Sequence, residues 1–338
     1  MMNTPKIIRP ISGFLLLVTG LFLVCLLSLS VGEIPMSYDQ ITGYLQDPDS
    51  MEYGVLWYIR IPRTVLAIAI GGSLSLAGVV LQGIYRNPLV EPYTLGISGG
   101  ASLGITFAII TGLYAMHSLL LPLFGFGGAL ITIFLVYTLS MGKSHGAVNR
   151  MLLIGVMISF ISSAIVMFLM SVTSVENLPG IIFWTMGSLN ESDMTLILFM
   201  ICSAFLILGI TYLFVPALNA LRLGESKARY LGINTQYAIR VLFILTSLLT
   251  GTCIAVAGVI GFVGLIIPHF TRLWVGTDYK YLLGASFLSG SIFLVLCDIV
   301  ARTVVAPNEL PIGVITGMTG GIAFIFILSR RTSHSKIL

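Results

Sequence analysis

The chain has 338 residues, of which 57% are hydrophobic and 9% are charged, and its formal net charge is +4. A typical soluble domain carries about 25% charged residues, so too few ionisable groups are present here to solvate a globule of this size. The sequence contains no block rich in Lys and Arg, and we therefore expect no nucleic-acid partner.

Continuous apolar runs predict an all-α integral membrane protein. Each run can cross a hydrocarbon core of ~30 Å as a helix of about 20 residues, whereas a transmembrane barrel would alternate apolar and polar positions. The first run follows Lys6 and Arg9 and is longer than the ~7–15 residues of a signal-peptide core, so we expect it to be retained. The eighth run is the shortest and predicts a half-helix flanked by irregular backbone. The ten predicted membrane segments are residues 11–31, 56–83, 93–110, 118–140, 150–171, 194–215, 238–257, 262–275, 281–301 and 311–329.

The distribution of Lys and Arg predicts the orientation of these segments. If the N-terminus is cytoplasmic and the segments alternate, every Lys and Arg falls inside except Arg60, Arg63 and Arg302, as the positive-inside rule requires. Both termini are then cytoplasmic, in a multi-pass protein of the inner or plasma membrane. The connecting stretches are too short to bury a core, so residues 1–338 are read as one transmembrane domain.

Enzyme and metal chemistry have weak support in the sequence. Gly96-Ile-Ser98-Gly-Gly100 matches the hydrolase nucleophile elbow, but that motif needs a preceding strand, and here a polar loop and a membrane helix surround it. We therefore expect no catalytic, metal or cofactor-binding residue, and keep an intramembrane hydrolase using Ser98 or His269 as an alternative of a different class.

The four cysteines lie in apolar spans without paired spacing and are expected to be buried hydrophobes: Cys25, Cys202, Cys253 and Cys297.

The longest internal cytoplasmic loop, residues 216–237, is predicted to form one or two short helices. Gly224 and Gly232 punctuate it, and Ser226 or Glu225 could cap the second helix. A short helix at the membrane surface can transmit force from a soluble motor to the helix bundle. The alternative is a connector whose basic residues meet anionic lipid.

Three arginines are predicted to lie on the outer side against the charge bias. Arg60 and Arg63 open the second segment, and Arg302 closes the ninth. Guanidinium groups suit carboxylate partners, so these residues could dock an acidic protein. The alternatives are snorkelling to lipid phosphates or internal pairing, for which Asp298 lies at i, i+4 from Arg302.

Small residues recur every four positions on three of the predicted helices. Such stripes allow helix backbones to approach closely in lipid. They indicate either packing within one subunit or a face toward a second subunit or a pathway. The stripes are Ala67, Gly71 and Ser75; Gly96, Gly100 and Gly104; and Gly313, Gly317 and Gly321.

Six ordered motifs between about Arg60 and Arg330 resemble those of a known family. They read Arg60-Ile-Pro-Arg63-Thr, Leu81-Gln-Gly-Ile-Tyr-Arg-Asn-Pro-Leu89, Glu91-Pro-Tyr-Thr-Leu-Gly-Ile-Ser-Gly-Gly-Ala101, Ala228-Arg-Tyr-Leu-Gly232, Gly261-Phe-Val-Gly-Leu-Ile-Ile-Pro-His269 and Glu309-Leu-Pro-Ile-Gly-Val314. On these motifs the chain resembles the FecCD-type permeases of ABC importers for iron-siderophores, haem and cobalamin.

The resemblance implies a type II ABC importer permease with ten helices per subunit, in a homodimer or close heterodimer. It also implies two cytoplasmic ABC ATPase subunits that hold ATP-Mg, an extracytoplasmic binding protein, and no cofactor on this chain. Arg60, Arg63 and Arg302 would pair with glutamates of the binding protein. The pathway would follow the dimer interface, lined largely by the fifth and tenth helices. The residues matched to ATPase coupling are Leu221, Gly224, Glu225, Ala228, Arg229, Leu231 and Gly232, and those matched to a cytoplasmic gate are Ala147, Val148 and Asn149.

The expected function is ATP-driven import of an iron(III)-siderophore or similar metal chelate by alternating access. Cobalamin and haem are alternatives within the same family. An ion-coupled secondary transporter is an alternative of another class, but it should place acids or His in mid-membrane, and no such residue stands out. The sequence contains no G-x-x-x-x-G-K-[ST] motif, so any ATP hydrolysis is expected in a separate chain.

Overall fold

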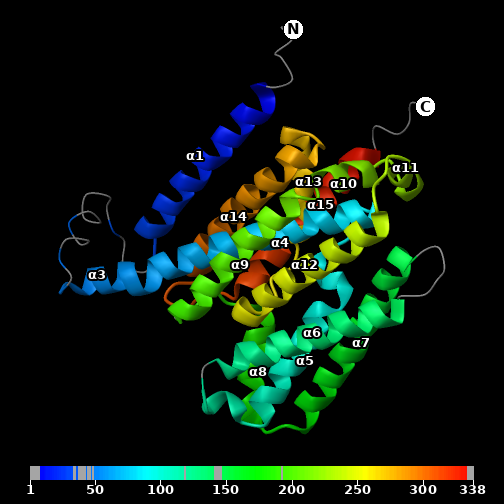
Figure 1. The fold of residues 1–338 in the computed structure, drawn as a ribbon. Helices are drawn as coiled ribbons and strands as arrows, with labels where there is room; N and C mark the ends of the chain where they lie inside the picture. Colours follow the sequence, from blue (N-terminus) through cyan, green and yellow to red (C-terminus); the bar gives the residue numbers. More distant parts are fainter. Residues whose placement is uncertain are drawn as a thin grey trace.

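The computed structural model describes residues 8–32, 36, 43, 47, 49–117, 119–140, 147–191 and 193–332, with the backbone alone at 8–11, 147–148 and 327–332. All regular structure in these residues is helical, and no strand occurs among them. The predicted all-α class is therefore confirmed (Figure 1). Lys6, Lys143 and Lys336, which entered the orientation prediction, lie outside the described residues.

Each of the ten predicted segments corresponds to a helix. In the described residues, seven helical runs are long and apolar enough to cross a membrane, and three further apolar helices are shorter. The ten are α1 (Ile8–Ser30), α4 (Ile61–Tyr85, continuing a π-helical turn η1 at Leu56–Arg60), α5 (Ile97–Ile110), α6 (Leu120–Ser140), α7 (Ala147–Val172), α9 (Met194–Tyr212), α12 (Thr235–Ala257), α13 (Val263–Val275), α14 (Tyr279–Thr303) and α15 (Ile312–Thr332).

Several shorter helices were not predicted. α8 lies in a stretch that reads as a polar loop because Glu176, Glu191 and Asp193 flank it, yet Ile181 within it is buried. Ile181 packs with Ile105 of α5 in a small apolar cluster. The unpredicted helices are α3 (Met51–Val55), η3 (Leu113–Ala115), η4 (Val175–Asn177) and α8 (Leu178–Met186). The start of the predicted segment 93–110 forms a separate 3-10 helix, η2 (Pro92–Leu95).

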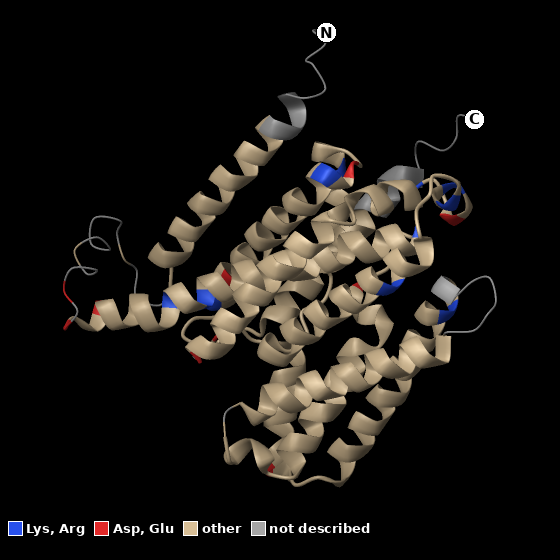
Figure 2. Cartoon of the chain, in the orientation of Figure 1, with Lys and Arg blue, Asp and Glu red and all other residues tan. Residues whose placement is uncertain are grey.

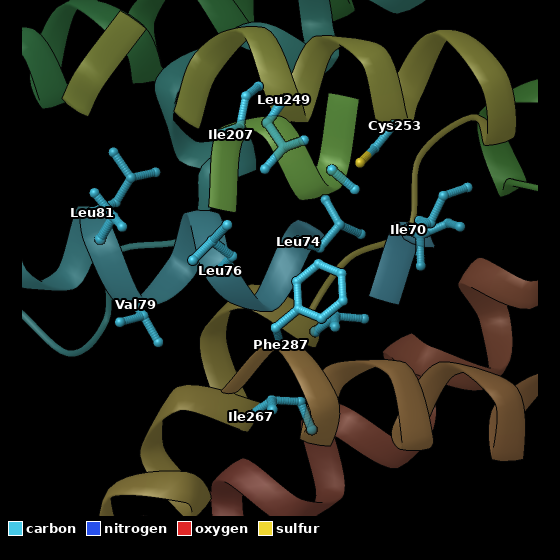
Figure 3. Close-up of a cluster of buried hydrophobic side chains, with 14 of the residues drawn as sticks. Ile70, Leu74, Leu76, Val79, Leu81, Ile207, Leu249, Cys253, Ile267 and Phe287 are labelled. Atoms are coloured by element: carbon cyan, nitrogen blue, oxygen red, sulfur yellow. The ribbon is translucent and has the colours of Figure 1, made fainter. Parts of the chain in front are cut away.

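Helix α4 forms the centre of the molecule, and α9, α12, α13 and α14 surround it (Figure 1). In the helical run Met51–Tyr85, which contains α4, 89% of an apolar 18-residue stretch is buried. The corresponding share in α1 is 11%. Side chains from all five helices meet around α4 in Figure 3. They include Ile70, Leu74, Leu76, Val79 and Leu81 of α4, Ile207 of α9, Leu249 and Cys253 of α12, Ile267 of α13 and Phe287 of α14.

Two of the predicted small-residue stripes pack within the chain. A Cβ on Gly71 of α4 would collide with the carbonyl of Gly290 on α14, and one on Gly100 of α5 would collide with Thr132 of α6. Such contacts bring helix backbones together where lipid provides no hydrophobic drive to associate. The stripe of α15 differs in part. A Cβ on Gly313 would collide with the carbonyl of Met186, whereas no described atom lies within 4 Å of a Cβ placed on Gly317 or Gly321.

Most charged side chains lie toward the ends of the helices (Figure 2); Glu91, which contacts Phe262 just before α13, is an exception. One end carries two further short helices, α10 (Val215–Leu221) and α11 (Glu225–Tyr230), together with the start of α1 and the end of α15 (Figure 1). The opposite end carries the start of α4. This distribution is the one expected for helices that cross lipid, where charged groups are costly.

Candidate functional site

The loop at residues 216–237 contains two short helices, α10 and α11, as predicted. The predicted caps of the second helix are wrong. Gly224, with φ of 109°, is the N-cap residue of α11, and no side chain caps the helix, because Glu225 already belongs to its first turn. Gly232 also has a positive φ, of 82°. Both glycines therefore occupy backbone conformations that other residues adopt only with strain.

Buried apolar residues fix this loop to the bundle. Leu221 is 2% exposed and Ala228 is fully buried. Glu225 and Arg229 form an i, i+4 ion pair on the solvent side, and the Nε of Arg229 donates to Oγ1 of Thr235 at 3.1 Å. The loop is therefore a firmly attached surface at one end of the molecule.

Two large apolar side chains project from the same loop. Tyr230 is 91% exposed and Leu231 is 62% exposed. The resemblance singled out Leu231 but gave no role to Tyr230. An aromatic residue in an otherwise charged short helix was the available signal, because aromatic side chains are enriched where proteins bind one another.

The three arginines that were predicted to lie outside come together at the end of the bundle opposite the α10–α11 loop, where an ion cluster joins α4 to α14. The Nε of Arg63 lies 2.7 Å from Oδ1 of Asp298, and the Nε of Arg302 lies 3.0 Å from Oδ2 of the same carboxylate. Asp298 is fully buried. The internal pair between Arg302 and Asp298, one of the alternatives left open by the sequence, is therefore present.

Loop residues complete this cluster. Nη1 of Arg63 donates to both carboxylate oxygens of Glu309 at 2.8 Å and to Oδ1 of Asn190. Nδ2 of Asn190 in turn donates to Glu309 at 3.0 Å. Burial acts to raise the pKa of Glu309, but the hydrogen bonds from Arg63 and Asn190 outweigh it and lower the pKa. Sequence reasoning missed Glu309 and Asn190, which lie far from Arg63 along the chain.

Arg60 and Arg302 attach the end of α1 to this cluster. Nη1 of Arg60 donates to the carbonyl of Leu29 at 2.6 Å, and Nη2 of Arg302 donates to Oγ of Ser28 at 3.0 Å. Arg60, Arg63 and Arg302 are all less than a tenth exposed. The structure thus groups the three predicted docking residues but covers their guanidinium groups with contacts inside the chain.

A break between α12 and α13 confirms the predicted half-helix with irregular flanking backbone. Phe262 has a left-handed φ of 69°, and its N–H donates to Oε1 of Glu91. The N–H of Ile260 donates to the hydroxyl of Tyr93 at 3.0 Å. Glu91 and Tyr93 therefore stabilise the irregular backbone between α12 and α13. The sequence motif that contains them did not predict this role.

The structure describes the remaining predicted sites only in part. Ala147, Val148 and Asn149 begin α7; Asn149 is exposed, and the side chains of the other two lie outside the described part. Ser98 lies in the first turn of α5 after the 3-10 helix η2, where a nucleophile elbow would need a strand. Among the described residues, no three His, Cys, Asp or Glu side chains gather where they could hold a metal.

Comparisons with known proteins cover almost the whole chain. The profile of the FecCD transport family matches residues 20–330. The hemin transport system permease protein HmuU of Yersinia pestis is 35% identical over 333 residues, which cover 96% of each chain. The vitamin B12 import system permease protein BtuC of Salmonella newport is 37% identical over 273 residues, covering 81% of this chain and 83% of BtuC.

A solved structure shares the fold. It is described as an inward-facing conformation of a metal-chelate type ABC transporter, and it superposes with a TM-score of 0.81 at 33% sequence identity. The superposition covers 95% of this chain and 99% of that chain. Sequence and structure agree over nearly the full length, and the chain therefore belongs to the FecCD transport family.

Proposed function

We propose that this chain is the membrane-spanning permease subunit of an ABC importer that carries a metal chelate, such as a ferric siderophore, into the cytoplasm. The observation that carries the proposal is the near full-length similarity to permeases of hemin and vitamin B12 and to a metal-chelate transporter. Haem and cobalamin are the alternative substrates, because relatives named for them are similarly close.

The α10–α11 loop is the surface proposed to receive an ATPase subunit on the cytoplasmic side. Tyr230 and Leu231 project from it, whereas Leu221 and Ala228 attach it to the core. A rigidly attached loop can convert closure of an ATPase dimer into movement of α9 and α12, between which it lies. ATP then drives the change only if it favours one state of the bundle over the other.

A second copy of the permease is proposed to cover α15, the tenth membrane helix. Met318 and Ile322 of α15 are more than 60% exposed, and nothing described approaches Gly317 or Gly321. Phe160 of α7, the fifth membrane helix, is also largely exposed. Large exposed apolar side chains on α7 and α15, and the uncovered glycines of α15, support a subunit interface with the pathway between the copies.

The arginine cluster is proposed to dock the extracytoplasmic binding protein by exchange of partners. Glu309 is bound to Arg63, yet its side chain is 39% exposed, so a carboxylate from outside can reach the same edge of the cluster. Arg60 and Arg302 are held to α1 by backbone and hydroxyl oxygens. An incoming glutamate would then replace Glu309 at the Arg63 guanidinium, which suits bidentate carboxylate binding.

Reconstitution in proteoliposomes tests the proposed function. The full chain is combined with its ATPase and binding-protein partners, and uptake of labelled ferric siderophore, hemin and cobalamin is compared with and without ATP. ATP-dependent uptake of one chelate is the expected result. Uptake that persists with a hydrolysis-dead ATPase would overturn the proposal in favour of a secondary transporter. Retained uptake in Ser98→Ala would argue against the hydrolase alternative.

A further inference from the structure

A cavity of about 230 Å³ lies at the end of α4 that faces the α10–α11 loop. Arginines from three different elements line it. Arg86 follows the last residue of α4, Arg222 follows the last residue of α10, and Arg272 lies in the last turn of α13. The role proposed above uses neither the cavity nor these arginines.

Neutral partners hold two of the three guanidinium groups in place. Nη1 of Arg272 donates to Oε1 of Gln82 at 2.6 Å. Gln82 is 4% exposed, and its Nε2 donates to the backbone carbonyls of Gly264 and Leu265, each at 3.2 Å. This chain of contacts orients Arg272 without neutralising its charge.

Arg222 is held in the same manner from the other side of the cavity. Its Nη1 donates to the carbonyl of Thr277 at 2.7 Å, and its Nη2 donates to Oγ1 of the same residue at 2.6 Å. The ring of Tyr279 forms a buried wall, and its hydroxyl lies so close to Gly83 that a Cβ there would collide with it. The walls of the cavity are therefore fixed by packing.

Arg86 differs, because its side chain makes no hydrogen bond or ion pair with the rest of the described chain. None of the salt bridges among the described residues involves any of the three cavity arginines. The nearby Asp278 accepts hydrogen bonds from Nδ2 of Asn219 at 2.8 Å and from the backbone N–H of Lys280 at 3.0 Å. These contacts, more than the charge of Arg222, lower the pKa of Asp278. Within the described part, none of the three guanidinium groups therefore forms a salt bridge with a carboxylate, although Asp278 is near enough to feel the charge of Arg222.

We propose that this cavity binds a phosphate group, carried either by an anionic lipid headgroup or by a free phosphate. The planar guanidinium fork matches phosphate oxygens, and charge-assisted bonds of this kind are strong. The volume is several times the roughly 30 Å³ that one water occupies in the liquid, so a phosphate fits. The proposal is independent of the transported substrate.

Neighbouring residues of α13 favour the lipid as the source. Leu273 and Trp274 adjoin Arg272 and are 70% and 65% exposed. Tryptophan is enriched at the headgroup level of membranes, and exposed apolar side chains beside the cavity can contact acyl chains. A lipid phosphate in the cavity would anchor the ends of α4, α10 and α13 together at the membrane surface.

The test uses the full chain purified in neutral detergent, alone and with its ATPase subunits bound. Short-chain phosphatidylglycerol, the matching phosphatidylcholine and inorganic phosphate are titrated separately, and the thermal midpoint and native mass spectrum are recorded. Stabilisation and retained adducts with phosphatidylglycerol, but not with phosphatidylcholine, identify a lipid headgroup. Stabilisation by inorganic phosphate at comparable concentration identifies a free phosphate site.

Variants at Arg86 locate the site. Arg86→Gln removes a guanidinium without breaking a described contact, and it should weaken anion binding at least about tenfold, while Arg86→Lys should recover part of the loss. Arg240→Gln, at an exposed position on α12 outside the cavity, is the matched control and should bind like the parent chain. Equal binding by all variants, or no anion effect on the parent chain, overturns the proposal. Loss of anion binding only when the ATPase is bound would also overturn it, and would assign the cavity to an acidic group of the ATPase.

Discussion

The Nε of Arg63 donates a 2.7 Å hydrogen bond to Oδ1 of Asp298 and so joins the start of α4 to α14 through a fully buried carboxylate. Asp298 also lies 3.0 Å from Arg302, and Arg63 has Glu309 as a second partner, so two acids share the charge of the two buried cations. A buried charge is tolerated only when it is paired. The cluster therefore stabilises the packing of α4 against α14 at this end of the bundle, independently of any partner that it binds.

Replacing the shared acid should destabilise the chain strongly. Asp298→Asn leaves the buried Arg302 without a counter-charge and Arg63 with Glu309 as its only acid, and loss of one partner of a buried pair costs about 3–5 kcal/mol. The expected result is a clearly lower thermal midpoint in detergent. Glu225→Gln, which breaks the exposed pair with Arg229, is the control and should cost less than about 1 kcal/mol. Similar midpoints for both variants would contradict a fastening role.

The lowered pKa of Glu309 predicts a pH dependence of stability. Its carboxylate is favoured in the folded chain, so its contribution is present above the ordinary pKa of 4.5 and is lost as the pH falls through the lowered value. The thermal midpoint of the parent chain should therefore drop below about pH 5 more steeply than that of Glu309→Gln. Parallel midpoint curves for the two proteins would show that the Arg63 contact contributes nothing.

The same substitution tests the exchange of partners proposed for docking. Glu309→Gln keeps the shape of the side chain but removes the charge that competes for Arg63, so the binding protein should dock more tightly, most visibly at low salt. Docking is measured by surface-immobilised binding protein at several salt concentrations. Glu176→Gln removes an exposed acid elsewhere on the chain and should have little effect. Weaker docking of Glu309→Gln would mean that Glu309 itself contacts the partner.

Substitution of Gly232 should disturb coupling more than folding. Its φ of 82° is unfavourable for any residue with a Cβ, although nothing lies within 4 Å to obstruct one. Gly232→Val should shift the end of α11, with a strain of roughly 1–2 kcal/mol, and lower the uptake per ATP hydrolysed. Gly209→Val also enters open space but in a helix without positive φ, and it should stay coupled. An equal uptake per ATP hydrolysed in both variants would show that the loop does not couple ATP hydrolysis to transport.

Tyr230→Ala should leave the fold intact and weaken ATPase binding. The side chain is 91% exposed, so the thermal midpoint should barely change, whereas a buried interface tyrosine can contribute about 2 kcal/mol or more to binding. Affinity for the ATPase subunit should fall by an order of magnitude or more. Tyr58→Ala, at an exposed tyrosine of the opposite end, should bind normally. Undiminished binding by Tyr230→Ala would place the contact elsewhere.

The sequence by itself determined the elements whose signal is local. Ten membrane helices followed from continuous apolar runs, the two short helices of residues 216–237 from a polar stretch between glycines, and the Arg302–Asp298 pair from i, i+4 spacing. Each depends on residues within a few turns of one another. The errors were local as well: α8 was hidden by flanking acids, and the start of α11 was set by the backbone freedom of Gly224 rather than by a side-chain cap.

Only the tertiary structure decided which distant groups meet. Arg63 and Asp298 are 235 positions apart, and Arg63 and Glu309 are 246 apart. The cavity arginines likewise come from three separate elements. Apolar runs of similar composition do not specify which helix packs against which in lipid. That choice falls to close backbone contacts such as Gly71 against Gly290, and the buried ion pairs form where those contacts bring the helix ends together.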